Sequence, residues 1–78
     1  MKTVTLISKD DCRLCEVAKE VLRKVQEDFT FHLEEKKIVP GSADFEQYHE
    51  RVPVILIDGD FAFQYRISER QMLEKLKN

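Results

Sequence analysis

Two short runs of consecutive apolar residues do most to limit the folds open to this chain. The segment Thr3–Ser8 is largely apolar, and Val54–Ile57 is wholly apolar and follows directly on Pro53. Such continuous runs are typical of central strands that are covered on both faces of a sheet, whereas a strand with one wet face alternates. A proline at the first position of a strand costs no ladder hydrogen bond. The two runs therefore predict an α/β fold with helices on both faces of the sheet.

Helical patterns occupy the segments between and after these runs. Ser68 with Gln71 three residues later forms a capping box ahead of a terminal helix, and Ser42 after Pro40-Gly41 can cap a short helix. The longest helix should begin near Leu14, because apolar residues recur there at intervals of three and four. Its predicted buried stripe is Leu14, Val17, Ala18, Val21, Leu22 and Val25.

Alternating residues predict two further strands at the edges of the sheet. Phe29, Phe31 and Leu33 alternate with polar residues, and a long helix before them favours a parallel crossover from the first strand. Asp58-Gly59 is a strong hairpin signal. The expected order is β-α-β-α-β-β-α around a four-stranded mixed sheet. The aromatic residues at helix or strand spacing are predicted to be core rather than a substrate groove: Phe45, Tyr48, Phe61, Phe63 and Tyr65.

Size and charge narrow the classes of function. With 78 residues, the chain has room for one domain, residues 1–78, and we expect a monomer. Its 42% hydrophobic and 36% charged residues include no run long enough to cross a bilayer. The net charge of -2 provides no basic field for nucleic acid. Because the first residues are too short and polar for a signal peptide, we expect a cytoplasmic location.

The two cysteines stand at Cys12-Arg13-Leu14-Cys15, between the first strand and the first helix. Free N–H groups and the helix dipole at a helix N-terminus stabilise a thiolate, so Cys12 is predicted to be the attacking sulfur. Cys15 lies one turn later on the same face, where it can resolve a mixed disulfide. Arg13 adds a cation, which Asp10, Asp11 and Glu16 oppose.

Two other interpretations of the cysteine pair remain open at this point. A metal-binding or metal-carrying module could hold a soft Cu(I) ion with two thiolates, although such modules usually run β-α-β-β-α-β. A redox-inert interaction domain could also retain the fold. A structural zinc site needs four ligands, and the two histidines, His32 and His49, are expected on exposed polar faces. We therefore assign no metal ligand.

The segments Ile7–Cys15 and Arg51–Gly59 together resemble the two signatures of the glutaredoxin-like branch of the thioredoxin superfamily, and the resemblance spans essentially the whole chain. It implies a thioredoxin-like fold and a thiol-disulfide oxidoreductase. It also implies that Pro53 follows a cis peptide bond and faces the cysteines, and that the Val52 backbone is free to pair with a substrate chain. The implied substrates are disulfide-containing proteins or low-molecular-weight thiols.

The resemblance is incomplete where glutaredoxins hold glutathione. Lys9 and Val52 match two of the family's glutathione-binding positions, but Tyr65-Arg66-Ile67-Ser68 replaces its glycine-rich turn. The motif also has Arg13-Leu14 in place of Pro-Tyr or Gly-Pro. We expect no tightly bound cofactor, with glutathione as a conceivable co-substrate. The implied substrate-binding residues are Lys9, Arg13, Val52 and Pro53, beside the catalytic pair Cys12 and Cys15.

Overall fold

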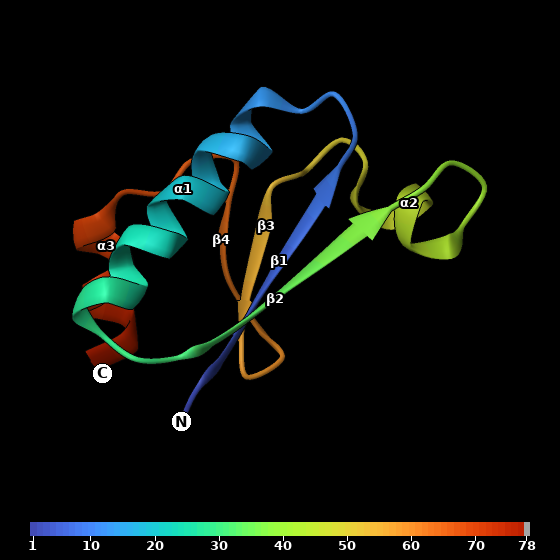
Figure 1. The fold of residues 1–78 in the computed structure, drawn as a ribbon. Helices are drawn as coiled ribbons and strands as arrows, with labels where there is room; N and C mark the ends of the chain where they lie inside the picture. Colours follow the sequence, from blue (N-terminus) through green and yellow to red (C-terminus); the bar gives the residue numbers. More distant parts are fainter. Residues whose placement is uncertain (78) are drawn as a thin grey trace.

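The computed structural model describes residues 1–77, and Asn78 lies outside the described residues. The first strand crosses over through a long helix to a parallel neighbour, and a hairpin and a final helix complete the chain (Figure 1). The elements are β1 (Thr3–Lys9), α1 (Arg13–Asp28), β2 (His32–Ile38), α2 (Ala43–Tyr48), β3 (Val54–Ile57), β4 (Asp60–Gln64) and α3 (Glu69–Lys77). The predicted order β-α-β-α-β-β-α is confirmed.

One mixed sheet organises these elements, with the strand order β2-β1-β3-β4. β1 pairs with β2 in parallel and with β3 antiparallel, and β3 pairs antiparallel with β4. The two apolar runs are therefore the central strands, as predicted. α1 and α3 lie together on one face of the sheet, and α2 lies on the other (Figure 1).

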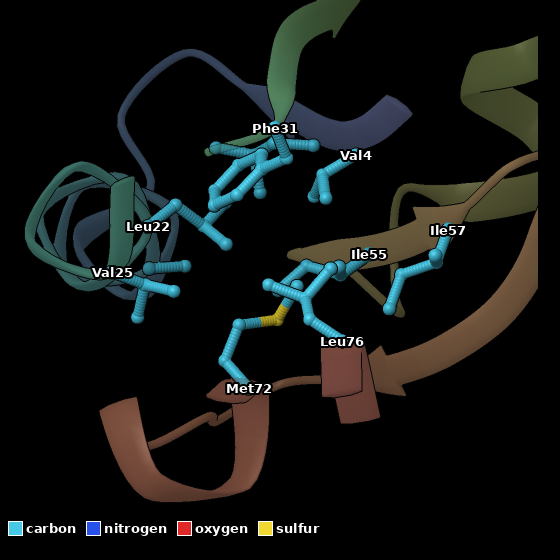
Figure 2. Packing of buried hydrophobic residues seen from close by; sticks show 10 residues of the cluster. Val4, Leu22, Val25, Phe31, Ile55, Ile57, Met72 and Leu76 are labelled. Carbon is cyan, nitrogen blue, oxygen red and sulfur yellow. The ribbon is translucent and has the colours of Figure 1, made fainter. Parts of the chain in front are cut away.

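The larger core lies between the sheet and the pair α1 and α3 (Figure 2). Val4 and Leu6 of β1 meet Leu22 of α1, and Met72 and Leu76 of α3 close the far side; all five are fully or almost fully buried. Burial of each large apolar side chain stabilises the fold by roughly 1.5–3 kcal/mol. This packing fixes α1, and with it the helix start that bears the cysteines.

The buried stripe of α1 differs from the predicted one. The helix buries Cys15, Ala18, Leu22 and Val25, while Val17 is 43% exposed. A helix begun at Arg13 with Cys15 turned inward places Val17 about 200° away around the axis. The sequence pattern included Val17 because it did not count a cysteine as an apolar position.

The second strand also differs from its prediction. α1 continues to Asp28, and Phe29 caps it through an N–H bond to the Val25 carbonyl (2.9 Å), so the strand begins at His32. It does lie at a sheet edge, but most of its side chains are exposed rather than forming one apolar face. Phe31 is buried in the core just before the strand starts.

The structure confirms the predicted hairpin turn but places two of the five aromatic residues outside the core. Asp58 and Gly59 both have positive φ, as a tight type I′ turn requires. A register irregularity opposite Ile55 and Leu56 breaks the expected alternation in β4. Phe61, within this irregular stretch, is 53% exposed, and Tyr65, just after β4, is 45% exposed, so their assignment to the core is wrong.

No helix within residues 1–77 is long and apolar enough to cross a membrane.

Candidate active site

Cys12 is the N-cap of α1. Asp11, with φ of 55°, turns the chain out of β1, and Cys12 then adopts an extended conformation while the helix starts at Arg13. The Cys12 sulfur accepts the backbone N–H of Cys15 at 3.2 Å. A sulfur in this position receives a free helix donor and lies at the positive end of the helix dipole. The backbone is thus arranged to stabilise negative charge on Cys12.

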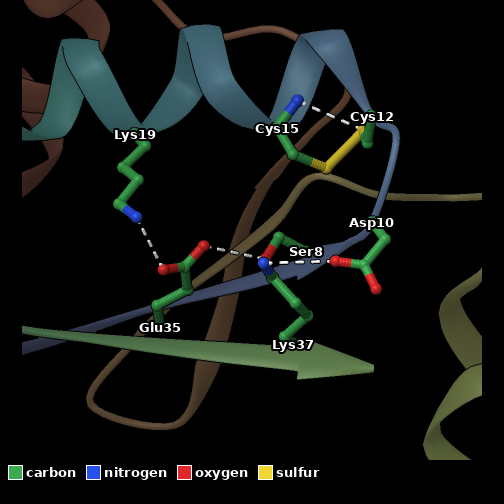
Figure 3. A network of polar contacts seen from close by, with 7 residues as sticks. All are labelled: Ser8, Asp10, Cys12, Cys15, Lys19, Glu35 and Lys37. Carbon is green, nitrogen blue, oxygen red and sulfur yellow. Dashed lines mark hydrogen bonds and ion pairs between the residues drawn. A yellow bond between two sulfur atoms is a disulfide. The ribbon is translucent and has the colours of Figure 1, made fainter. Parts of the chain in front are cut away.

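Cys12 and Cys15 are joined in a disulfide, with their Cα atoms 5.3 Å apart (Figure 3). The two residues differ in accessibility, since Cys12 is partly exposed and Cys15 is only 4% exposed. Cys15 belongs to the smaller apolar cluster with Ile7 and Val52. An incoming sulfur can therefore reach Cys12 but not Cys15.

The Val52-Pro53 peptide bond is cis, as the resemblance implied. Both residues are buried, and Cys12 packs against the cluster that contains Val52. Tyr65 donates its N–H to the Pro53 carbonyl at 2.9 Å. The Val52 N–H donates to the Tyr48 carbonyl at 3.1 Å, so the expectation that the Val52 backbone is free is wrong for this donor.

A cavity of about 390 Å³ joins Lys9 to Cys12 and Cys15. The Lys9 ammonium donates to the His49 carbonyl at 3.1 Å, which ties the end of β1 to the end of α2. Arg13 is exposed at the first residue of α1 and is not among the residues lining this cavity. The structure thus groups Lys9 with the cysteines and leaves Arg13 outside the cavity.

The histidines differ from each other. His32 is 56% exposed, as expected. The His49 side chain is only 34% exposed because its ring stacks on Phe45, with the ring centroids 4.8 Å apart. Within residues 1–77, no group of three or more His, Cys, Asp and Glu side chains is placed to hold a metal ion.

A polar network beside the cysteines was missed from the sequence (Figure 3). Ser8, 2% exposed at the end of β1, donates its hydroxyl to one Glu35 oxygen at 3.0 Å, and Lys19 donates to the other at 2.8 Å. The hydrogen bond from Lys19 lowers the pKa of Glu35 against the opposing effect of burial. No local pattern could have revealed the network, because Glu35 lies 16 residues from Lys19 and 27 from Ser8.

A smaller cavity of about 160 Å³ lies on the other side of α1. Its lining includes Leu14 from the cysteine motif and also Tyr65 and Arg66, which stand where the resemblance would place the glycine-rich turn of glutaredoxins. Tyr65 has φ of 67°, a conformation that glycine adopts without strain. Tyr65 thus has a left-handed backbone conformation, and both Tyr65 and Arg66 line the cavity.

Residues 3–77 match the model of the glutaredoxin-like domain (DUF836) family. A structural genomics target protein from X. campestris superposes with a TM-score of 0.80 at 24% identity, covering 95% of each chain. A protein from Nitrosomonas europaea gives 0.78 at 22% identity, covering 95% of this chain and 89% of its own.

Glutaredoxin 1 from Francisella tularensis, solved with cacodylate, gives a TM-score of 0.59 at 17% identity and covers 99% of this chain and 94% of its own. At these identities the likenesses show a shared fold.

Proposed function

Since this chain belongs to the glutaredoxin-like domain family, we propose that it is a thiol-disulfide oxidoreductase that uses Cys12 as nucleophile and Cys15 as resolving thiol. The observation that carries the proposal is the unequal setting of the two sulfurs. Cys12 is accessible and accepts a helix N–H, whereas Cys15 is buried one turn further on. An exchange reaction needs one sulfur exposed to substrate and a second protected until the first has reacted.

The reaction proceeds by two sulfur exchanges. The Cys12 thiolate attacks one sulfur of a substrate disulfide, the substrate S–S bond breaks, and the first substrate thiolate leaves and takes up a proton. Cys15 then loses its proton and attacks the Cys12 sulfur, which releases the second substrate thiolate. The substrate gains two electrons and two protons, and the protein ends as the Cys12–Cys15 disulfide. A cellular dithiol or monothiol must reduce that disulfide to complete the cycle.

We propose disulfide-containing proteins or low-molecular-weight thiols as substrates, with glutathione as a co-substrate at most and no tightly bound cofactor. Lys9, Arg13, Val52 and Pro53 are the proposed substrate-binding residues. Lys9 shares the cavity of the cysteines, and Val52 shares their apolar cluster, which supports both assignments. We also propose that the protein is a cytoplasmic monomer, because a reducing compartment keeps a dithiol in the reduced form in which it reacts.

Mixed-disulfide trapping tests the proposal. Cys15→Ser should retain the first exchange and accumulate a covalent adduct with a small neutral disulfide, seen as a mass increase that dithiothreitol removes. Cys12→Ser should form no adduct and lose disulfide-reductase activity. Each variant replaces a single sulfur atom of the wild-type protein by oxygen, so each serves as the control for the other. Full activity in Cys12→Ser would overturn the proposal, and so would metal bound by reduced wild-type protein through both thiols in place of exchange.

A further inference from the structure

The side chain of Lys19 lies on α1 one helical turn beyond Cys15, at the spacing that places two residues on the same helix face. Its ammonium reaches across to Glu35 of β2, and Glu35 also accepts the hydroxyl of the buried Ser8 of β1. Three elements therefore fix the position of one ion pair. The cavity that contains the two cysteines is lined by Ser8, Lys19 and Glu35 as well (Figure 3).

An ion pair at a sheet edge contributes little to stability, typically about 0–1 kcal/mol. The Lys19 and Glu35 side chains are 35% and 32% exposed, which makes them the least exposed of the lysine or arginine pairs with a carboxylate that the structure shows within residues 1–77. Ser8 is the buried polar residue that anchors the carboxylate. This degree of fixation next to a reactive sulfur pair indicates a role beyond holding the edge strand.

We propose that the Lys19–Glu35 pair sets the redox equilibrium of Cys12 and Cys15, with Lys19 as the favourable charge and Glu35 as the residue that positions and partly neutralises it. The inference rests on the proposed function. Reduction of the disulfide takes up two electrons and two protons, and a low-pKa thiol then releases its proton to leave a thiolate. A nearby cation stabilises that thiolate and favours the reduced state, while a nearby carboxylate disfavours it.

A different role for Glu35, as acceptor of the Cys15 proton, is disfavoured. The Lys19 hydrogen bond lowers the pKa of Glu35 below its ordinary value of 4.5. An unperturbed thiol titrates near ~8.5, well above an ordinary carboxylate, so a carboxylate whose pKa is lowered further is a poor acceptor for a thiol proton. Glu35 therefore stays ionised, and its effect on the sulfurs is electrostatic.

Other charged side chains line the same cavity, and they stay the same when Lys19 or Glu35 is replaced. β1 contributes Lys9, and the loop after it contributes Asp10 and Asp11. β2 contributes Lys37, which pairs with Asp10 at 3.3 Å. The remaining charges on α1 are Glu16, Glu20 and Arg23. Among the ion pairs at this cavity, Lys19–Glu35 is the one tied to a buried hydroxyl, and for that reason its removal is the informative change.

The test is the thiol-disulfide equilibrium of the pair, measured against thiol redox buffers by counting free thiols. Lys19→Met should stabilise the disulfide, and Glu35→Gln should stabilise the dithiol. Each should change the equilibrium constant by on the order of three- to tenfold and no more, because solvent screens partly exposed charges. A tenfold change equals about 30 mV for a two-electron couple. The double variant, with both Lys19→Met and Glu35→Gln, should have an equilibrium constant close to that of wild type. Lys19→Arg, which keeps the positive charge, should also match wild type.

Lys36→Met is the matched control. Lys36 neighbours Glu35 on β2 and forms an ion pair of the same length, 2.8 Å, with Asp44 of α2 on the opposite face of the sheet. It should leave the equilibrium unchanged. Shifts of the same sign in both single variants, no return in the double variant, or an equal shift in Lys36→Met would overturn the inference. The equilibrium between Cys12 and Cys15 is measured in the protein without any substrate. A failure of this inference can therefore be distinguished from a failure of the proposed activity, which the trapping experiment tests.

Discussion

The Lys9 ammonium donates to the carbonyl of His49 at 3.1 Å, so the residue that matches the glutathione-binding lysine of glutaredoxins already has a hydrogen-bond partner within the protein. A cation on the last carbonyls of a helix is favourable, and this contact joins β1 to the end of α2. The Val52 N–H is committed in the same way to Tyr48. Two of the groups that the resemblance assigns to glutathione therefore already have partners.

We predict that glutathione disulfide is reduced no faster than a neutral small disulfide. Lys9→Met should leave that rate ratio unchanged, because the Lys9 ammonium is already hydrogen-bonded to the His49 carbonyl. It should lower the free energy of unfolding by about 1 kcal/mol through the loss of that hydrogen bond. Steady-state rates with both disulfides and urea unfolding check the two outcomes. Lys24→Met, at an exposed position on α1, is the control. A selective loss of the glutathione rate in Lys9→Met would show that Lys9 swings out to bind it.

The Glu35 carboxylate predicts a pH dependence of stability. Its pKa is lowered, first by the hydrogen bond from Lys19, so the folded state favours the ionised form. The resulting stabilisation is fully present above the ordinary value of 4.5 and is lost as the pH falls through the lower pKa of the folded protein. Wild type should thus be more stable than Glu35→Gln at pH 7, and the difference should shrink at pH 3.

Urea unfolding at both pH values measures this difference. Glu74→Gln serves as control because Glu74 pairs with Arg70 on an exposed face of α3, with side chains 66% and 88% exposed. A gap between wild type and Glu35→Gln that is the same at pH 3 and pH 7 would contradict the prediction.

Much of the fold could be predicted because its signals are local. The apolar runs, the Asp58-Gly59 turn and the Ser68 capping box each depend on neighbours within a few residues. Cys12 and Cys15 could be placed at a helix start for the same reason. The cis bond before Pro53 followed from the resemblance alone, since the sequence by itself favours trans.

What could not be predicted depends on contacts between distant segments. Cys15 is buried and Val17 is exposed on α1, because contacts with the sheet and with α3 decide which side of the helix turns inward. The irregularity in β4 turns Phe61 outward, and it arises in pairing with β3. The Ser8–Glu35–Lys19 network joins three elements, so none of the three residues is distinguished in its own segment.

The Asp58-Gly59 turn offers a test of backbone strain without side-chain effects. Gly59 has φ of 86°, and a Cβ added there meets nothing within 4 Å. Gly59→Ala should therefore lower the free energy of unfolding by about 1–2 kcal/mol through the left-handed backbone alone. Gly59→Asn should lose less, because asparagine tolerates this conformation. Equal losses for alanine and asparagine, measured by urea unfolding, would point to a cause other than backbone strain.

The capping box at Ser68 controls whether α3 covers the core. The Ser68 hydroxyl accepts the Gln71 N–H at 3.1 Å, and the Gln71 side chain accepts the Ser68 N–H at 3.2 Å. α3 buries Met72 and Leu76 against α1 and the sheet, so loss of the cap should weaken a helix that the core needs. Ser68→Ala should cost about 1 kcal/mol of unfolding free energy, whereas Ser68→Asp, which keeps an acceptor oxygen, should cost much less.

Amide hydrogen exchange in α3 distinguishes this effect from a general loss of stability. Ser68→Ala should speed exchange mainly in the first turn of α3, because the Gln71 N–H loses its acceptor there while the α1 amides keep theirs. Uniform acceleration through α1 and α3 together would mean that the cap acts only through global unfolding. Equal acceleration in Ser68→Asp would mean that the serine hydroxyl itself, rather than an acceptor oxygen, holds the helix start.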